Sequence, residues 1–317
     1  MPDESESVVD WDSLTFSFTK TDRMYLSKCK LGGEWAVGSM MDFEDLVISP
    51  AAGVLNYGQG LFEGMKAQRA SDGSIVLFRP DRNAKRAQEG ALRLGMPPVP
   101  EEIFLDAVIK TVRENSRWVP PMGKGALYIR PLLMGSGPIL GVAPAPEYTF
   151  LVFTSPVGPY FKGGITPTSL RVSERFHRAA PGGSGGVKAI GNYAPGMIPS
   201  KMAKKEGYSE IIYLDAVNHR YIEEVGAANF FCVKDGVIST PELTGTILPG
   251  VTRASIIELA MARGYEVREE KVDVEYAMSA DECFCVGTAA VVSSIGRIQY
   301  GERAVSYTHL TLPTIDP

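Results

Sequence analysis

Lys188 stands in the segment SGGVKAIGNYAPG (residues 184–196), among glycines and small apolar residues, with Tyr193 five positions later. A lysine at its ordinary pKa of about 10.4 is protonated and cannot act as a nucleophile. Burial among apolar groups, or a neighbouring cation, lowers the pKa and frees the amine to form a Schiff base. Because most lysines are exposed, the alternative is a flexible loop with a solvated lysine. The segment alone leaves both possibilities open.

The elements that must position Lys188 follow from hydrophobic spacing and turn residues. Helices are predicted over residues 81–95, 100–118, 197–206 and 249–264. We expect Asp81 to cap the first helix and Gly95 to end it. Strands are predicted at 126–134 and 148–157, with hairpins that turn at Asn218 and at Asp235-Gly236. A mixture of strands and helices indicates an α/β or α+β fold.

The stretch PVGPYFKGGITPT, residues 156–168, is rich in proline and glycine. Such composition is typical of a connection between domains, and 317 residues suit two domains. We therefore expect a smaller α+β domain over residues 1–157, a connection over 158–168 and a larger domain over 169–317.

Composition narrows the class of ligand. The net charge is −5 and the pI is about 5.4, so there is no electrostatic case for nucleic acid or an anionic membrane. Four scattered cysteines and three histidines predict neither a disulfide framework nor a metal site. A small-molecule substrate is expected.

The sequence predicts no targeting or membrane segment. No apolar run reaches the length of a membrane span, and the acidic start MPDESESVVDWDS lacks the features of a signal or import peptide. We expect a soluble intracellular protein, in the cytoplasm or, if a leader is missing, in a plastid or mitochondrion.

Two glycine-rich stretches do not fit known phosphate loops. GQGLFEG at 58–64 lacks the third glycine and the preceding strand of a dinucleotide site, and GGSGG at 182–186 lacks the following G-K-[ST]. The lysine segment, by contrast, resembles that of the fold-type IV pyridoxal-phosphate enzymes. Further motifs occur in the order that these enzymes share: NYGQGLFEGMKA (56–67), LFRPDRNAKR (77–86), LYIRP (127–131), GPYF (158–161), EEVGAANFF (223–231), ILPGVTR (247–253) and VGTAAVV (286–292).

Over about residues 11–305 the chain resembles the branched-chain amino acid aminotransferases, with a plant-like character. The resemblance implies an α/β architecture, in which an α+β small domain and a larger α/β pseudo-barrel domain enclose pyridoxal 5'-phosphate. It also implies transamination of L-leucine, L-isoleucine and L-valine with 2-oxoglutarate. Departures are Ala290 and Ser293, where mammalian relatives carry a redox-active C-x-x-C, and the tail SYTHLTLPTIDP, which does not match after about residue 305.

The resemblance also implies roles for individual residues. Lys188 would bind the cofactor covalently and move the proton, Glu224 would face the pyridine nitrogen, and Tyr193 would bond the phenolic oxygen. An arginine fork and the free N–H groups of a helix start suit a phosphate. The full set of expected cofactor-binding residues is Arg86, Lys188, Tyr193, Glu224, Leu248, Val251, Thr252 and Thr288. Without the resemblance, Glu224 or its neighbour Glu223 would be read as an exposed hairpin charge.

The substrate side is expected to draw on both domains. Tyr128 and Arg130 would hold substrate carboxylates, together with turn amides at Thr288 and Ala289. Apolar walls would come from Phe62, Tyr160 and Tyr57, with Tyr57 donated by a neighbouring subunit, which implies a homodimer. The rival functions are a D-amino acid aminotransferase, an aminodeoxychorismate lyase, and a non-catalytic cofactor-binding homologue.

Overall fold

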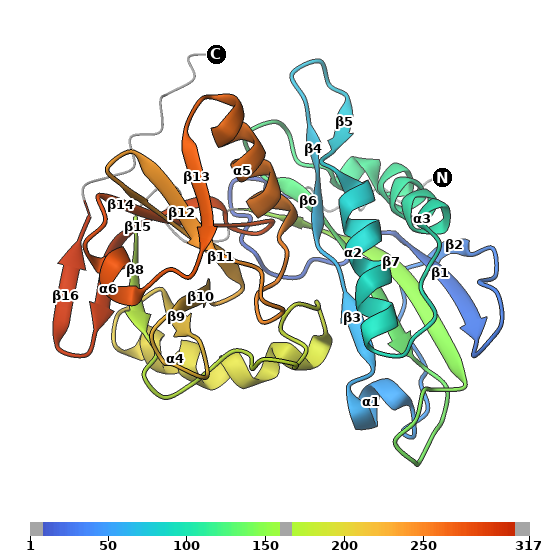
Figure 1. Ribbon diagram of the computed structural model, residues 1–317. Coiled ribbons are helices and arrows are strands. Elements are labelled where there is room, and N and C mark those ends of the chain that lie inside the picture. The colour runs from blue at the N-terminus through green and yellow to red at the C-terminus, as the bar shows by residue number, and fades with distance from the viewer. Residues whose placement is uncertain (1–8, 159–166, 308–317) are drawn as a thin grey trace.

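Two β-sheets organise the chain in the computed structural model, which describes residues 9–158 and 167–307 (Figure 1). The first sheet runs in the order β2-β1-β7-β6-β4-β5, with β3 paired to β6. Its long central strands are almost wholly apolar and pair antiparallel from Ala126↔Val157 to Gly135↔Tyr148. The strands are β1 (Arg23–Lys30), β2 (Ser39–Asp42), β3 (Gly60–Phe62), β4 (Met65–Arg69), β5 (Ile75–Leu77), β6 (Ala126–Gly135) and β7 (Glu147–Val157).

Helices pack on this sheet through one apolar face. In α3 (Glu101–Glu114) the buried residues recur at helical spacing, and Phe104 stacks on Phe150 of β7 at 5.6 Å between ring centroids. Helix α2 (Pro80–Arg93) confirms the predicted helix and ends before Gly95, whose φ is +64°. The expected cap is wrong: the helix begins after Arg79, and Asp81 lies inside its first turn, because Pro80 takes the first helical position. The remaining helices of this half are α1 (Gly53–Tyr57) and the 3₁₀ turn η1 (Ser116–Trp118).

The second sheet runs in the order β10-β9-β8-β15-β14-β11-β12-β13, with β16 beside β15. An additional pairing of β10 with β11 closes part of it into a barrel. The predicted turn at Asp235-Gly236 is confirmed, with positive φ at both residues. The strands are β8 (Thr168–Val172), β9 (Glu210–Leu214), β10 (Ile222–Val225), β11 (Ala228–Lys234), β12 (Val237–Pro241), β13 (Glu266–Glu270), β14 (Glu282–Gly287), β15 (Val291–Tyr300) and β16 (Arg303–Ser306).

The barrel has its own core, in which Phe230, Cys232 and Cys285 are fully buried. Burial raises the pKa of both thiols to about 12, so these cysteines are inert packing groups. The helices of this half are α4 (Met197–Lys205), α5 (Val251–Ala262), α6 (Val274–Met278), η2 (Ile190–Asn192) and η3 (Ala194–Gly196). No helix in the described residues is long and apolar enough to cross a membrane.

The two sheets meet along the lysine segment and the helices α2 and α5, at the centre of Figure 1. Leu61 of β3 forms a bridge with Ala189, and the Phe62 amide donates to the Lys188 carbonyl at 3.1 Å. Arg79 at the start of α2 bonds Ser255 of α5 at 2.8 Å. These contacts fix the backbone of Lys188 against the first sheet. The first sheet ends with β7 and the second begins with β8. Residues 159–166 lie outside the described ranges, and the domain bounds expected from the sequence stay a prediction.

Candidate active site

A cavity of about 180 Å³ lies where the two sheets meet. Residues from β3, β6, α2, the lysine segment, α5 and the turn after β14 line it, although they are distant in sequence. Most of the residues expected at the site from the sequence share this cavity: Phe62, Arg86, Tyr128, Lys188, Tyr193, Leu248, Val251, Thr252, Thr288 and Ala289.

The Lys188 amine lies in surroundings that suit a nucleophile. Its Nζ lies 3.2 Å from the Tyr193 hydroxyl and 4.7 Å from the centre of the Phe62 ring. Burial, and then the nearby Arg86 cation, lower the pKa of Lys188 to about 8. Burial also raises the pKa of Tyr193, which keeps the phenol protonated. A minor fraction of the amine is therefore already neutral at physiological pH, far more than for an exposed lysine, and the neutral form is the one that attacks a carbonyl.

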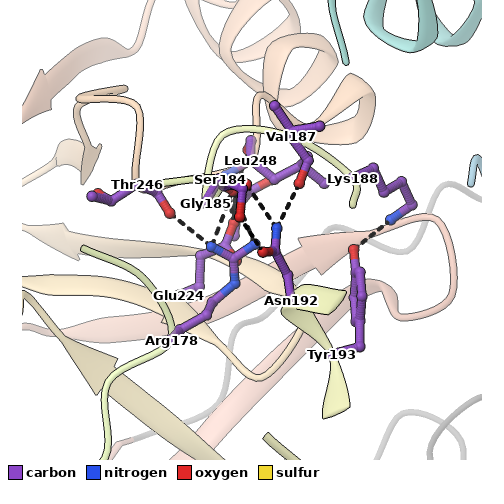
Figure 2. Close-up of polar contacts among 11 residues, drawn as sticks. Arg178, Ser184, Gly185, Val187, Lys188, Asn192, Tyr193, Glu224, Thr246 and Leu248 are labelled. Atoms are coloured by element: carbon purple, nitrogen blue, oxygen red, sulfur yellow. Dashed lines mark hydrogen bonds and ion pairs between the residues drawn. The ribbon is translucent and has the colours of Figure 1, made fainter. Parts of the chain in front are cut away.

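The loop that carries Lys188 is held by the Asn192 side chain. Its Nδ2 donates to the carbonyls of Ser184 and Val187 at 2.7 and 2.9 Å, and its Oδ1 accepts from Ser184 Oγ at 2.7 Å (Figure 2). Gly185 has to be glycine, because an added Cβ would lie 2.3 Å from the Thr246 carbonyl oxygen. The loop is thus packed closely on its neighbours and is not a loose surface loop.

Glu224 lies behind the cavity on β10, with 2% of its surface exposed. Its Oε1 accepts from the Leu248 amide at 2.9 Å and from Asn229 Nδ2 at 3.1 Å, and both of those residues line the cavity. Its Oε2 lies 2.5 Å from Arg178 Nε. Burial raises the pKa of Glu224 to about 7, although Arg178 opposes the shift. Its neighbour Glu223 lines a different cavity, so of these two carboxylates Glu224 is the one whose hydrogen-bond partners line this site.

Arg86 of α2 presents a guanidinium that is already oriented. Nε and Nη2 donate to the two oxygens of Glu63 at 2.8 and 2.7 Å, and Nη1 donates to the Pro249 carbonyl at 2.9 Å. An arginine has five N–H groups, so two remain after these three bonds to described residues. Both lie on the nitrogens at the end of the fork, the geometry that binds phosphate oxygens bidentately.

Next to Arg86, α5 begins with its N–H groups at the cavity. Val251 and Thr252 line the cavity, and no side chain of the described residues caps this helix start. Free N–H groups and the helix dipole favour an anion here. Gly250 permits the close packing, since an added Cβ would lie 2.1 Å from Asn229 Oδ1.

These groups fit the four polar parts of pyridoxal phosphate. The fork of Arg86 and the start of α5 suit the phosphate, and the Tyr193 hydroxyl and the Lys188 amine suit the phenolic oxygen and the aldehyde. Glu224 suits the pyridine nitrogen, because an ionised carboxylate can accept a hydrogen bond from the protonated nitrogen and so keep it protonated.

Of the two side chains expected to bind a carboxylate, Tyr128 lines the cavity, whereas Arg130 does not line it and contacts Tyr128 and Phe62, which do. Arg130 Nη2 donates to the Tyr128 hydroxyl at 3.2 Å, and the guanidinium lies 4.5 Å from the Phe62 ring centre. Arg130 Nε is buried without a partner among the described residues. Lys66 Nζ, whose pKa burial lowers to about 8, donates to the Ala289 carbonyl at 3.2 Å and ties the 288–290 turn to the first sheet.

One expected wall residue, Tyr57, is not brought to the cavity of its own chain. Tyr57 ends α1 with 40% of its surface exposed, and its hydroxyl bonds the Leu140 carbonyl. Tyr160 lies outside the described residues.

Sequence reasoning missed residues that stand behind the expected ones. Glu63 lies in the motif NYGQGLFEGMKA, and it could have been predicted as the carboxylate that pairs with Arg86 and orients it. Asn229 likewise lies in the motif EEVGAANFF, whereas Arg178 carries no comparable local signal. Phe16, which lines the cavity and packs on Tyr128 at 5.2 Å between ring centroids, was also missed.

We expect Glu63→Gln to lower the free energy of unfolding of the cofactor-free protein by about 3–5 kcal/mol at pH 7, because it leaves a buried arginine unpaired. Burial alone would raise the pKa of Glu63, but Arg86 and Lys188 bring it below the ordinary 4.5. The pair's contribution is therefore present above about pH 4.5 and is lost as the pH falls through the lower folded value.

Urea unfolding at pH 7 and pH 4 measures both effects. The matched control is Glu275→Gln, which removes an exposed partner of Arg303 and should change stability little. Equal stability of the Glu63→Gln and native proteins at pH 7 would contradict the argument.

Comparison with known proteins agrees with this geometry. The class IV aminotransferase family matches residues 60–298. The chloroplastic branched-chain-amino-acid aminotransferase 3 of Arabidopsis thaliana is 54% identical over 308 residues, which cover 97% of this chain and 75% of that protein.

Two solved structures are similar over the whole fold. The branched-chain amino acid aminotransferase of Escherichia coli has a TM-score of 0.78 and 30% identity, over 90% of this chain and 89% of that one. A T.th. branched-chain amino acid aminotransferase, complexed with N-(5'-phosphopyridoxyl)-L-glutamate, has a TM-score of 0.73 and 28% identity, over 90% and 88% of the two chains. The chain therefore belongs to the class IV aminotransferases, pyridoxal-phosphate enzymes, and within them to the group of branched-chain amino acid aminotransferases.

Proposed function

We propose that this protein transfers the amino group of L-leucine, L-isoleucine or L-valine to 2-oxoglutarate, and that the reaction is reversible. The observation that carries the proposal is the partly neutral amine of Lys188, placed in one cavity with the Arg86 fork and backed by Glu224. An apolar wall with a cation at one side suits both kinds of substrate, the branched-chain amino acid and the dicarboxylic acid.

Each residue around the cofactor has a definite task in this proposal. Pyridoxal phosphate supplies an electron sink for the bond broken at the substrate Cα. Arg86 and the amides of Val251 and Thr252 hold its phosphate, and Thr288 adds a hydroxyl. Leu248 packs against its ring. Glu224 keeps the pyridine nitrogen protonated.

Lys188 has two tasks. Its amine holds the cofactor between turnovers, and when the substrate displaces it, Nζ takes the proton from the substrate Cα. Tyr193 remains within hydrogen-bond reach of this nitrogen, at 3.2 Å, and keeps it directed into the cavity. General-base transfer by a positioned amine contributes about 10²–10⁴-fold to such a rate.

Substrate binding uses the opposite side of the cavity. Arg130 and Tyr128 bind a carboxylate, and the turn amides of Thr288 and Ala289 assist. Phe62 provides the apolar wall in this chain, with Tyr160 as a further expected wall residue. Apolar walls discriminate weakly between side chains that differ by one methylene, so all three branched-chain amino acids should be accepted.

We also propose a homodimer in which Tyr57 reaches the cavity of the neighbouring subunit. Its exposed position at the end of α1, away from its own cavity, supports this arrangement.

The test is formation of 2-oxo acids from L-leucine, L-isoleucine and L-valine with 2-oxoglutarate. Lys188→Ala should lower kcat by about 10²–10⁴-fold. Lys204→Ala, which alters an exposed lysine of α4, is the control and should behave like the native protein. Native turnover in Lys188→Ala, or activity only with D-leucine or aminodeoxychorismate, would refute the proposal.

The lowered pKa of Lys188 predicts how the cofactor-free protein takes up pyridoxal phosphate. Only the neutral amine attacks the aldehyde, so the rate should rise with pH around a midpoint of about 8. An exposed lysine would give a midpoint near its ordinary value of 10.5. Stopped-flow absorbance between pH 6.5 and 9.5 measures the rate; a rate that is flat, or still far below its plateau at pH 9.5, would contradict the assigned environment.

A further inference from the structure

Arg178 stands behind Glu224 and does not line the cavity. It follows β8 in the chain, and its side chain is only 7% exposed. Nε lies 2.5 Å from Glu224 Oε2, while Nη1 donates to the Thr246 carbonyl at 2.7 Å (Figure 2). Both terminal nitrogens also donate to the Gly185 carbonyl at 3.2 Å. One guanidinium therefore connects β10, the lysine loop and the segment before α5.

The surroundings of Glu224 leave one acceptor position open. Arg178 occupies one position on Oε2, and Asn229 and Leu248 occupy two on Oε1. An ionised carboxylate offers about four positions, so one remains on Oε2 after these bonds to described residues. A protonated carboxyl would instead carry its own hydrogen, and it would no longer stabilise a protonated pyridine nitrogen by accepting a hydrogen bond from it.

The charge of Glu224 depends on a balance among its neighbours. Burial favours the neutral acid, and the nearby Glu223 carboxylate acts in the same direction. Arg178, the Leu248 amide and the Lys188 amine favour the ionised form, and Arg178 has the largest effect of the three. Once Lys188 has bound the aldehyde, the charge on its nitrogen depends on the pH. Arg178 then remains as the permanent cation of this group.

We propose that Arg178 is a positioning residue that keeps Glu224 ionised and oriented, and thereby maintains the proton on the pyridine nitrogen of the cofactor. This inference rests on the proposed function. Arg178 acts through Glu224, without contact with the substrate. Its bonds to Gly185 and Thr246 also keep the lysine loop in register with that carboxylate, so the amine and the ring nitrogen are positioned by one group.

The test measures the visible absorption band of bound pyridoxal phosphate as a function of pH. A protonated pyridine nitrogen repels a proton at the Lys188 nitrogen, so loss of the ring charge makes the Lys188 nitrogen titrate at higher pH. Arg178→Gln and Glu224→Gln should each raise the midpoint by about one unit. In the Glu224→Gln background, Arg178→Gln should produce no further shift, and Arg178→Lys should restore most of the native midpoint in the single variant.

A purely structural role would give a different pattern. Arg253 is a second buried arginine, which bonds the Pro241 carbonyl and Glu269 at 2.8 Å. Arg253→Gln is the matched control and should lower the melting temperature without moving the midpoint. A native midpoint in Arg178→Gln, or shifts that add in the double variant, would overturn the inference while leaving the proposed function intact. A native protein without the visible band would overturn both.

Discussion

An unpaired buried charge costs several kcal/mol, and the described part of this site buries two acids and two arginines around one amine. The constraint is met by pairing Arg86 with Glu63 and Glu224 with Arg178. Arg86 lines the cavity, and Glu63 lies behind it. Glu224 contacts residues that line the cavity, and Arg178 lies behind Glu224. The same charges change the pKa of Lys188. Arg86 lowers this pKa, while Glu63 and Glu224 raise it. Burial decides the outcome and lowers the pKa of the amine to about 8.

The fold follows from the need to bring these pairs together. Glu224 and Asn229 face each other across the β10–β11 pairing that closes the barrel, so barrel closure places the carboxylate. Arg86 comes from the other sheet and meets the second through the Pro249 carbonyl. The lysine segment is held from both sides, by Phe62 of β3 and by Arg178. The site therefore exists only when both sheets are in place.

The sequence predicted most of what depends on local pattern or on an ordered set of motifs. The helices over α2 and α5 and the turn at Asp235-Gly236 follow from spacing and turn chemistry. The Asp81 cap failed because proline at the next position upstream already starts the helix. Arg178 was not predicted, because the role we propose for it depends on its contact with Glu224, 46 positions later in the chain. No periodic pattern in the sequence indicates such a contact. Tyr57 shows the same limit, since the cavity that it serves in our proposal is not its own.

The measurement that tests the central claim most directly is the absorbance spectrum of the protein with pyridoxal phosphate, before and after L-leucine is added without an acceptor. We expect a visible band that L-leucine converts to a near-ultraviolet band, and that 2-oxoglutarate restores. This result would show that the amino group has moved to the cofactor at the site of Lys188. A visible band that L-leucine leaves unchanged while D-leucine converts it, or a folded protein that forms no such band, would contradict the account.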